Sequence, residues 1–298
     1  MVKSNVLTIG NSLTILNASG FSAYLRGFSA IDSFLNRDTG LGVQILTSAD
    51  TADLARLFEA LRFPGIDLAD AALDCKEHTF YFYCTDSERP AGFGQSQWGN
   101  TFPADSRYSS FSLLDFYQDC NTRSFLDRHG IYPLIAGLRQ TGKNISNADT
   151  AGINAFEILE ENLNPAAERT RALMDAALFL AKYFPENRET ERQSGKIAAL
   201  FRGLDEGPPP GKEEQRLLLG SLLTSPNPGL GLELLKSSGF ISELWPELAE
   251  LDKVDHSKEF HPEGNVWSHT IETFRYRKAG LRGAYDLRLS LGLLLHDI

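Results

Sequence analysis

The first half of the chain mixes hydrophobic patterns of strand period and of helix period. Residues 5–16 (NVLTIGNSLTIL) predict two short β-rich runs around a Gly-Asn turn. Between Phe21 and Leu35 apolar residues recur every three or four positions, which predicts an amphipathic helix. Ser48 or Asp50 is the expected N-cap of a further helix. Three other runs have the composition of strands: residues 41–47, 78–84 and 109–118. This mixture indicates an α/β (or α+β) unit.

After about residue 150 the pattern becomes helical only. Four segments carry apolar residues at helical spacing: 153–163, 167–184, 213–223 and 231–239. Gly239 is a predicted helix stop. Residues 202–212 contain three consecutive prolines, so they predict an exposed loop. We therefore expect a mixed first part, an all-α middle part and a further helical segment from about residue 251.

Composition is that of a folded, water-soluble protein. Hydrophobic residues make up 42% of the 298 positions, which is enough for real cores. The apolar runs fall short of the roughly 20 residues of a membrane helix, and the N-terminal segment makes a poor signal peptide. Cys75, Cys84 and Cys120 form no C-x-x-C pair, so we expect reduced thiols. These features predict a cytoplasmic protein that is not bound to membranes.

The charge balance argues against strong nucleic-acid binding. The formal net charge is −10, whereas proteins that bind nucleic acid usually carry a basic surface. One basic cluster is a candidate RNA or phosphate patch: Arg275, Arg277, Lys278, Arg282 and Arg288. The alternative is that these side chains belong to a solvated helix end and turn.

A family resemblance begins in the last quarter of the chain. Residues 260–270 (FHPEGNVWSHT), followed by residues 293–298 (LLLHDI), resemble the HD domain of bacterial tRNA nucleotidyltransferases and poly(A) polymerases. Residues 222–248 resemble the stretch that precedes this domain in those enzymes. The resemblance implies a helical neck and body of the RNA-binding type at 150–250 and the beginning of an HD domain at 251–298.

The first half resembles the catalytic head of the same family by position. Residues 23–37 stand where the family has its phosphate loop, and residues 42–58 stand at its metal-binding strand and following helix. Residues 125–142 resemble the end of the head. The resemblance therefore implies a nucleotidyltransferase-like head at 1–145.

The HD resemblance implies a divalent-metal site built from His269, His296 and Asp297. His261 would lie near the pocket. Imidazole and carboxylate ligands suit Mn, Fe, Ni, Zn or Mg. The family's fourth ligand, an Asp on a later helix, would fall beyond Ile298, so we expect an incomplete site and a natural domain that runs on. Apolar residues 291–295 also suggest oligomerisation through this end.

The head departs from the family at the positions that hold its metal ions. Gly42 and Gln44 replace two carboxylates that would share one face of a strand. Glycine offers no ligand, and an amide is a weak substitute where Mg²⁺ prefers carboxylate oxygen. The phosphate loop keeps Gly27 and Asp32. Further family residues are also replaced, by Phe28 and Ile31 in the loop, Tyr108, Ser109 and Ser110 before a later strand, and Met174 and Ala177 in the neck.

Three functions remain open at this point. The leading one is a degenerate member of the tRNA nucleotidyltransferase/poly(A) polymerase family that has lost nucleotidyl transfer and keeps an RNA-binding or regulatory role. RNA, including tRNA, is then the expected partner, bound weakly because of the negative net charge. The second is a metal-dependent HD phosphohydrolase in the full-length protein. The third is residual CCA-adding or poly(A) polymerase activity.

Overall fold

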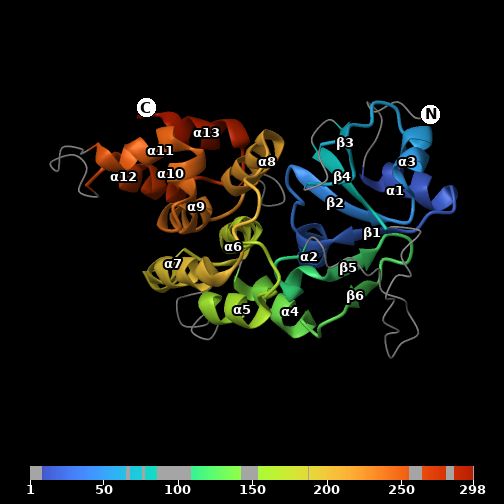
Figure 1. The fold of residues 1–298 in the computed structure, drawn as a ribbon, viewed down its shortest axis with the longest axis horizontal. Helices are drawn as coiled ribbons and strands as arrows, with labels where there is room; N and C mark the ends of the chain where they lie inside the picture. Colours follow the sequence, from blue (N-terminus) through green and yellow to red (C-terminus); the bar gives the residue numbers. More distant parts are fainter. Residues whose placement is uncertain are drawn as a thin grey trace. The chain divides into compact units, whose positions relative to one another are not determined.

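The computed structural model describes residues 9–64, 68–75, 78–85, 109–141, 154–186, 188–254, 264–279 and 285–297. The chain forms two compact units, Met1–Ala136 and Gly137–Ile298. Figure 1 shows a sheet with helices in the first unit and helices alone in the second. This confirms the expected change from a mixed α/β architecture to an all-α one. Among the described helices, none is both long enough and apolar enough to cross a membrane.

The first unit is built on a six-stranded mixed sheet of order β3-β4-β2-β1-β5-β6. Its strands are β1 (Ala23–Arg26), β2 (Gly42–Thr47), β3 (Ala71–Cys75), β4 (His78–Cys84), β5 (Phe116–Asp119) and β6 (Phe125–Asp127). β2 and β4 run parallel, and the other neighbouring pairs are antiparallel. β2 and β4 confirm the strands predicted at 41–47 and 78–84. Their inward side chains, including Val43, Ile45, Phe80 and Phe82, are fully buried and form the core.

Helices α1 (Ile9–Ala18) and α2 (Gly27–Leu35) pack against this sheet. The first unit also contains α3 (Thr51–Leu57), the 3₁₀ turn η3 (Ser112–Leu114) and the beginning of α4 (Tyr132–Thr141). Asp50 is the N-cap of α3, and its side chain accepts the Asp53 N–H at 2.7 Å, as predicted. α2 packs on β1, β2 and β5, which brings its first turn next to the strand that carries Gly42 and Gln44.

Three sequence predictions for the first unit were wrong. In the stretch 5–16, the described residues from Ile9 onward form helix α1, because Leu13 and Leu16 share one buried helix face. The helix expected from Phe21 begins only at Gly27, since residues 23–26 pair with β2 and β5 instead. In the stretch 109–118, only Phe116 onward is strand, and η3 precedes it.

The second unit is a helical array. Its elements are α5 (Ala155–Asn162), α6 (Arg169–Tyr183), α7 (Arg188–Leu200), η4 (Phe201–Gly203), α8 (Lys212–Leu223), α9 (Pro228–Ser237), α10 (Phe240–Leu244), α11 (Pro246–Glu250), η5 (Leu251–Lys253), α12 (Val266–Thr273), η6 (Phe274–Tyr276) and α13 (Leu287–Leu295). The four predicted helical segments correspond to α5, α6, α8 and α9. Gly239, at φ +86°, follows the end of α9 as expected.

The core of the second unit lies where α9 crosses α6. Gly231 on α9 allows this close approach, because a Cβ there would lie 2.5 Å from Leu222 Cδ2 and 2.7 Å from the Ala177 carbonyl oxygen. Met174 and Ala177 are both buried on α6. The two neck positions at which the chain departs from the family that it resembles are therefore core positions here.

Replacing Gly231 with alanine should lower the free energy of unfolding by about 1–3 kcal/mol, since the added methyl group meets backbone and the core must shift. Gly195 on α7 is the matched control, because an added Cβ there meets nothing within 4 Å. Gly195→Ala should stabilise the protein by up to about 1 kcal/mol through helix propensity alone. Chemical denaturation of both variants tests the packing. Equal changes in the free energy of unfolding at the two glycines would contradict the close packing of Gly231.

Candidate functional site

The first element of the site is helix α12. Asn265 is its N-cap and accepts the Ser268 N–H at 2.9 Å. Val266 and Trp267 are buried, and the Trp267 indole N–H donates to Glu233 on α9. The apolar face thus fixes the rotation of the helix about its axis. His269 lies beside this buried face, on a side that solvent still reaches.

The second element is helix α13, which carries the other two candidate ligands at its end. Asp286 is the N-cap and accepts the Leu289 N–H at 2.9 Å. Ser290 and Leu294, four residues apart, are its buried positions. His296 is the C-cap and Asp297 follows it directly. Leu289 and Leu295 are largely exposed, and oligomerisation through this helix stays a prediction.

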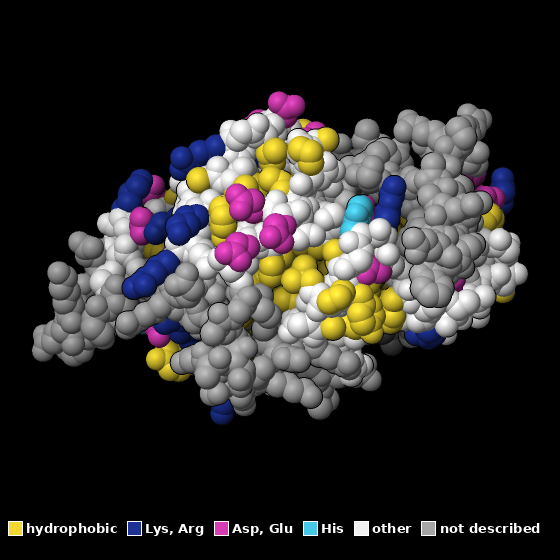
Figure 2. Space-filling view, turned by 90° about the horizontal axis from the view of Figure 1, so that it is seen from below, with side chains coloured by type: hydrophobic (Ala, Val, Ile, Leu, Met, Phe, Trp, Pro, Cys, Tyr) yellow, Lys and Arg dark blue, Asp and Glu magenta, His cyan; other side chains and the backbone are white. Residues whose placement is uncertain are grey.

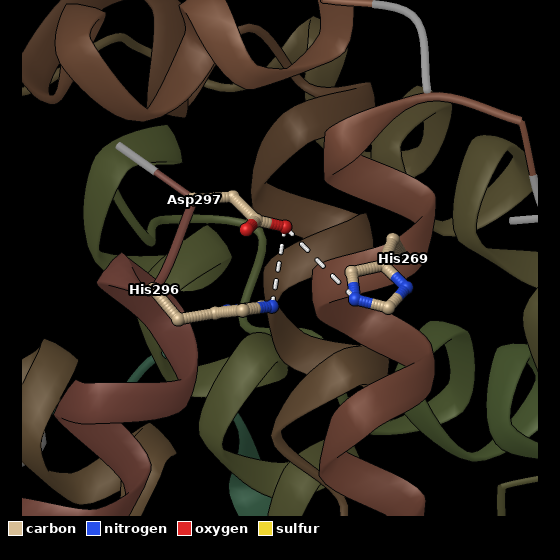
Figure 3. A group of neighbouring side chains, drawn as sticks. All are labelled: His269, His296 and Asp297. Atoms are coloured by element: carbon tan, nitrogen blue, oxygen red, sulfur yellow. Dashed lines mark ion pairs between the residues drawn. The ribbon is translucent and has the colours of Figure 1, made fainter. Parts of the chain in front are cut away.

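His269, His296 and Asp297 converge, as Figure 3 shows. Asp297 Oδ2 lies 3.2 Å from His296 Nε2 and 3.9 Å from His269 Nε2. The two imidazole ring centroids are 5.2 Å apart. One ligand atom from each residue lies within 4.8 Å of the other two. The three side chains therefore surround a common point, although 27 positions along the chain separate the two histidines.

The hydrogen bonding of His296 prepares its outer nitrogen for a ligand role. His296 Nδ1 lies 2.7 Å from the Leu293 carbonyl oxygen, which can only accept a hydrogen bond. A neutral ring that donates to this carbonyl carries its proton on Nδ1 and keeps the Nε2 lone pair, 3.2 Å from Asp297 Oδ2, for a metal ion. A backbone carbonyl that orients a histidine in this way is the usual partner of a metal ligand.

The donor set fits a divalent metal ion. Bonds of about 2.0–2.2 Å place neighbouring donor atoms roughly 3–4 Å apart around one ion. Two of the three donor separations, 3.2 and 3.9 Å, lie in this range, and all three donor atoms lie within 4.8 Å of one another. Two imidazoles and one carboxylate suit Mn, Fe, Ni or Zn, and Mg less well. His261, which the sequence places near this pocket, lies outside the described residues.

The basic cluster predicted from the sequence divides into different environments. Arg275 forms ion pairs with Glu272 and with Glu186, the latter at 3.3 Å. Arg277 is half-buried and donates to backbone carbonyls. Lys278 and Arg288 are exposed, whereas Arg282 lies outside the described residues. The solvent-facing part of the cluster is therefore smaller than the sequence suggests.

In the first unit, Gln44 packs against the turn that opens α2. The Gln44 N–H donates to Ser29 Oγ at 2.9 Å. Gln44 Oε1 lies 2.9 Å from where a Cβ on Gly27 would be, and Gly27 has φ +52°. The Gln44 amide thus fills the space beside this turn. Phe28, Ile31 and Asp32 are all buried.

A buried polar cluster in the first unit was missed by sequence reasoning. Ser109 Oγ donates to Asp115 Oδ1 at 2.9 Å, and it accepts from Arg26 Nη2 at 3.4 Å. Tyr117 OH donates to the same carboxylate oxygen at 3.4 Å, and His129 Nε2 lies 3.1 Å from Oδ2. Burial raises the pKa of Tyr117 to about 12, against a lowering effect from Arg26, so the phenol stays protonated.

This cluster joins β1, β5 and the segment before η3, and the Arg26 guanidinium also stacks on the Tyr83 ring at 4.4 Å. Its members are far apart along the chain, and only Arg26 stands out in the sequence, as a charged residue at the end of a buried strand. Its hydrogen bonds run between protein groups and hold the strands together.

Comparisons with known proteins leave the family open. No family model and no protein of curated function matches the chain. Among solved structures, the Bacillus stearothermophilus CCA-adding enzyme in complex with CTP is 18% identical, over 78% of this chain and 51% of that one, with a TM-score of 0.42. A tRNA nucleotidyltransferase complexed with a primer tRNA and an incoming ATP analogue is 17% identical, over 90% and 74% of the two chains, with a TM-score of 0.43.

A CCA-adding enzyme with ATP is 13% identical over 96% of this chain and 61% of that one, with a TM-score of 0.43. The chain spans about half the length of the first of these enzymes. At these identities and TM-scores the likeness carries no argument about fold or activity.

Proposed function

We propose that the second unit is a metal-dependent phosphohydrolase of the HD type, with His269, His296 and Asp297 as its metal ligands. The observation that carries the proposal is the convergence of these three side chains from two separate helices within 4.8 Å. A second point supports it, since a hydrogen bond from His296 Nδ1 to the Leu293 carbonyl would leave Nε2 available to a metal ion.

Each residue has a definite role in this proposal. The two histidines supply neutral imidazole nitrogens, and Asp297 supplies a charged oxygen. Their side chains are 19%, 33% and 27% exposed for His269, His296 and Asp297, so water and a phosphate ester can reach the ligand atoms. These residues are three of the four protein ligands that the HD resemblance implies, and they leave one side of the ion open to water and substrate, as in catalytic sites. A bound divalent ion would supply Lewis acidity and activate water toward a phosphorus–oxygen bond.

We further propose that the first unit does not transfer nucleotides. Neither Gly42 nor Gln44 on β2 carries a carboxylate, and the Gln44 side chain packs against Gly27. Two-metal nucleotidyl transfer needs carboxylates that bridge its ions, and the described part of β2 has none to offer.

RNA binding stays a prediction. The nucleotidyltransferase named above was solved with a primer tRNA, and the resemblance noted in the sequence points the same way. On the face drawn in Figure 2, Lys and Arg side chains are interspersed with Asp and Glu side chains. The net charge of −10 predicts weak binding to RNA, and salt would weaken further the part of it that Lys and Arg contribute.

Metal binding tests the proposal directly. Titration with Co²⁺, followed by visible absorption and by calorimetry, should give one tight site per chain in the wild type. His269→Ala should abolish that site, because it removes a ligand atom. His78→Gln is the matched control, because His78 bonds to the Gly40 carbonyl in the first unit. A wild type that binds no Co²⁺, Mn²⁺ or Zn²⁺, or a His269→Ala variant that binds like the wild type, overturns the proposal.

A further inference from the structure

Arg277 makes an unusual number of contacts for a residue in a basic, surface-like stretch. Its Nη1 donates to the Leu223 carbonyl at 2.6 Å and to Ser290 Oγ at 2.7 Å. Its Nη2 donates to the carbonyls of Ser225 at 2.9 Å and Pro226 at 3.3 Å. Its Nε donates to the Phe274 carbonyl at 3.3 Å.

These bonds use the whole hydrogen-bonding capacity of the side chain. A guanidinium carries five N–H groups, and each of the five has an acceptor in this structure. No donor is left for a phosphate group. Arg277 therefore does not serve the RNA or phosphate patch that the sequence suggests.

Two aromatic rings and a helix C-terminus stabilise the positive charge of Arg277. The guanidinium lies over the Phe274 ring at 5.0 Å and the Tyr285 ring at 4.5 Å. Burial lowers the pKa of Arg277 to about 10, partly offset by Tyr285 and Glu186, so the side chain is still protonated at neutral pH. Leu223 is the last residue of α8, and a cation is favoured beside the carbonyl groups of a helix C-terminus.

The contacts of Arg277 connect the two helices that carry the candidate ligands. Arg277 follows η6, which directly continues α12, the helix of His269. Ser290 is on α13, six residues before His296, and it is fully buried. Ser290 also donates to the Asp286 carbonyl at 2.8 Å, so it is held from both sides.

Helix α13 has few other anchors. Apart from Ser290, its one buried residue is Leu294, while Leu289 and Leu295 are largely exposed. The placement of His296 and Asp297 against His269 thus depends on few contacts of α13, and the Arg277–Ser290 hydrogen bond is one of them.

We infer that Arg277 is a positioning residue of the metal centre: it clamps the end of α12 and the middle of α13 onto the C-terminus of α8, and thereby sets the distance between His269 and the His296–Asp297 pair. This inference rests on the proposed function, because it assigns a role toward the same site. It predicts that cutting the clamp impairs metal binding in a protein that is still folded.

The variants separate the clamp from general stability. Arg277→Lys keeps the charge but replaces a planar fork of five donors by one compact ammonium group. Ser290→Ala leaves the carbonyl contacts of Arg277 intact and removes its link to α13, together with the bond from Ser290 Oγ to the Asp286 carbonyl within α13. Arg216→Gln is the control, since Arg216 is an exposed arginine of α8 outside these contacts.

Two readouts apply to each variant, at a temperature at which far-ultraviolet circular dichroism shows the native helix content. The first is the Co²⁺ dissociation constant together with the visible spectrum of the bound ion. We expect Arg277→Lys to weaken binding by about 10- to 100-fold and to alter the spectrum, as loss of a supporting contact does at other metal sites. Ser290→Ala should weaken it less, and Arg216→Gln should match the wild type.

The second readout needs no metal. Hydrogen–deuterium exchange of the α13 amides should become faster in Arg277→Lys and Ser290→Ala, whereas exchange in α6 should not change. If the wild type binds no metal, the proposed function fails, and exchange still decides whether Arg277 holds α13. Wild-type affinity and spectrum in Arg277→Lys, or unchanged α13 exchange in both variants, would overturn the clamp.

Discussion

Replacing Asp297 with alanine should lower Mn²⁺-dependent hydrolysis of a phosphodiester by at least about 100-fold, a larger loss than that expected for a supporting contact. The reaction adds water across one phosphorus–oxygen bond and releases a phosphomonoester and an alcohol. Asp297 is the one charged ligand of the three, and its Oδ2 is the atom that faces both histidines. Its removal takes away a ligand and also the negative charge that holds a divalent cation.

The assay is hydrolysis of bis(p-nitrophenyl) phosphate with Mn²⁺ and with Ni²⁺, followed by p-nitrophenolate absorbance. Asp205→Ala is the matched control, because Asp205 is an exposed aspartate of the second unit. Asp297→Asn adds a finer comparison, since the amide keeps the shape and one oxygen but loses the charge. The rate of hydrolysis by Asp297→Asn should be close to that of Asp297→Ala. Hydrolysis that persists in Asp297→Ala would place the activity elsewhere and remove the basis for an HD-type site.

The second large effect concerns the first unit. Incubation with tRNA that lacks its 3′ CCA, labelled CTP and ATP should give incorporation at the level of a reaction without protein, with Mg²⁺ and with Mn²⁺. Positions 42 and 44 hold Gly and Gln, so the ions that would bridge the triphosphate and the attacking hydroxyl have no carboxylate on β2. Loss of about 4 kcal/mol of charge stabilisation alone corresponds to a rate about a thousandfold lower.

The double variant Gly42→Asp/Gln44→Asp shows whether the carboxylates are the cause. Incorporation that appears in the double variant would identify them as the missing element. A double variant that stays inactive agrees with the other replacements, such as Phe28 in the loop at the start of α2. Clear incorporation by the wild type would contradict the prediction, because other carboxylates would then have to hold the ions. Retention of the tRNA on a filter in the same reaction measures RNA binding separately.

Several helices of the second unit could be predicted from the sequence, because the patterns that predict them lie within short stretches of the chain. Apolar residues three and four apart predict α6, α8 and α9, and each of these helices buries the stripe on which the prediction rests. The Asp50 N-cap of α3 could be predicted for the same reason, because its side chain bonds to a residue only three positions away. Strands β2 and β4 were also predicted, since both are apolar runs that lie buried in the middle of the sheet.

The errors in the first unit have a common physical cause. Residues 23–26 have helical spacing, yet they form β1 because Tyr24 pairs with Leu46 on one side and with Asp119 on the other. Both partners are distant in sequence, and the hydrogen bonds that they provide outweigh a local preference. The cluster of Arg26, Ser109 and Asp115 was missed for the same reason.

The sequence by itself determined the residue types of the candidate metal centre, two histidines and an aspartate on helices, and the absence of carboxylates at positions 42 and 44. The tertiary structure decided that His269 meets His296 and Asp297, and that Arg277 faces carbonyl groups rather than solvent. The reason is that ligand chemistry is a property of single side chains, whereas distances and burial depend on how whole helices pack. A short pattern cannot encode the carbonyl oxygen of Leu223, 54 residues before Arg277, which takes part in holding α12 and α13 together.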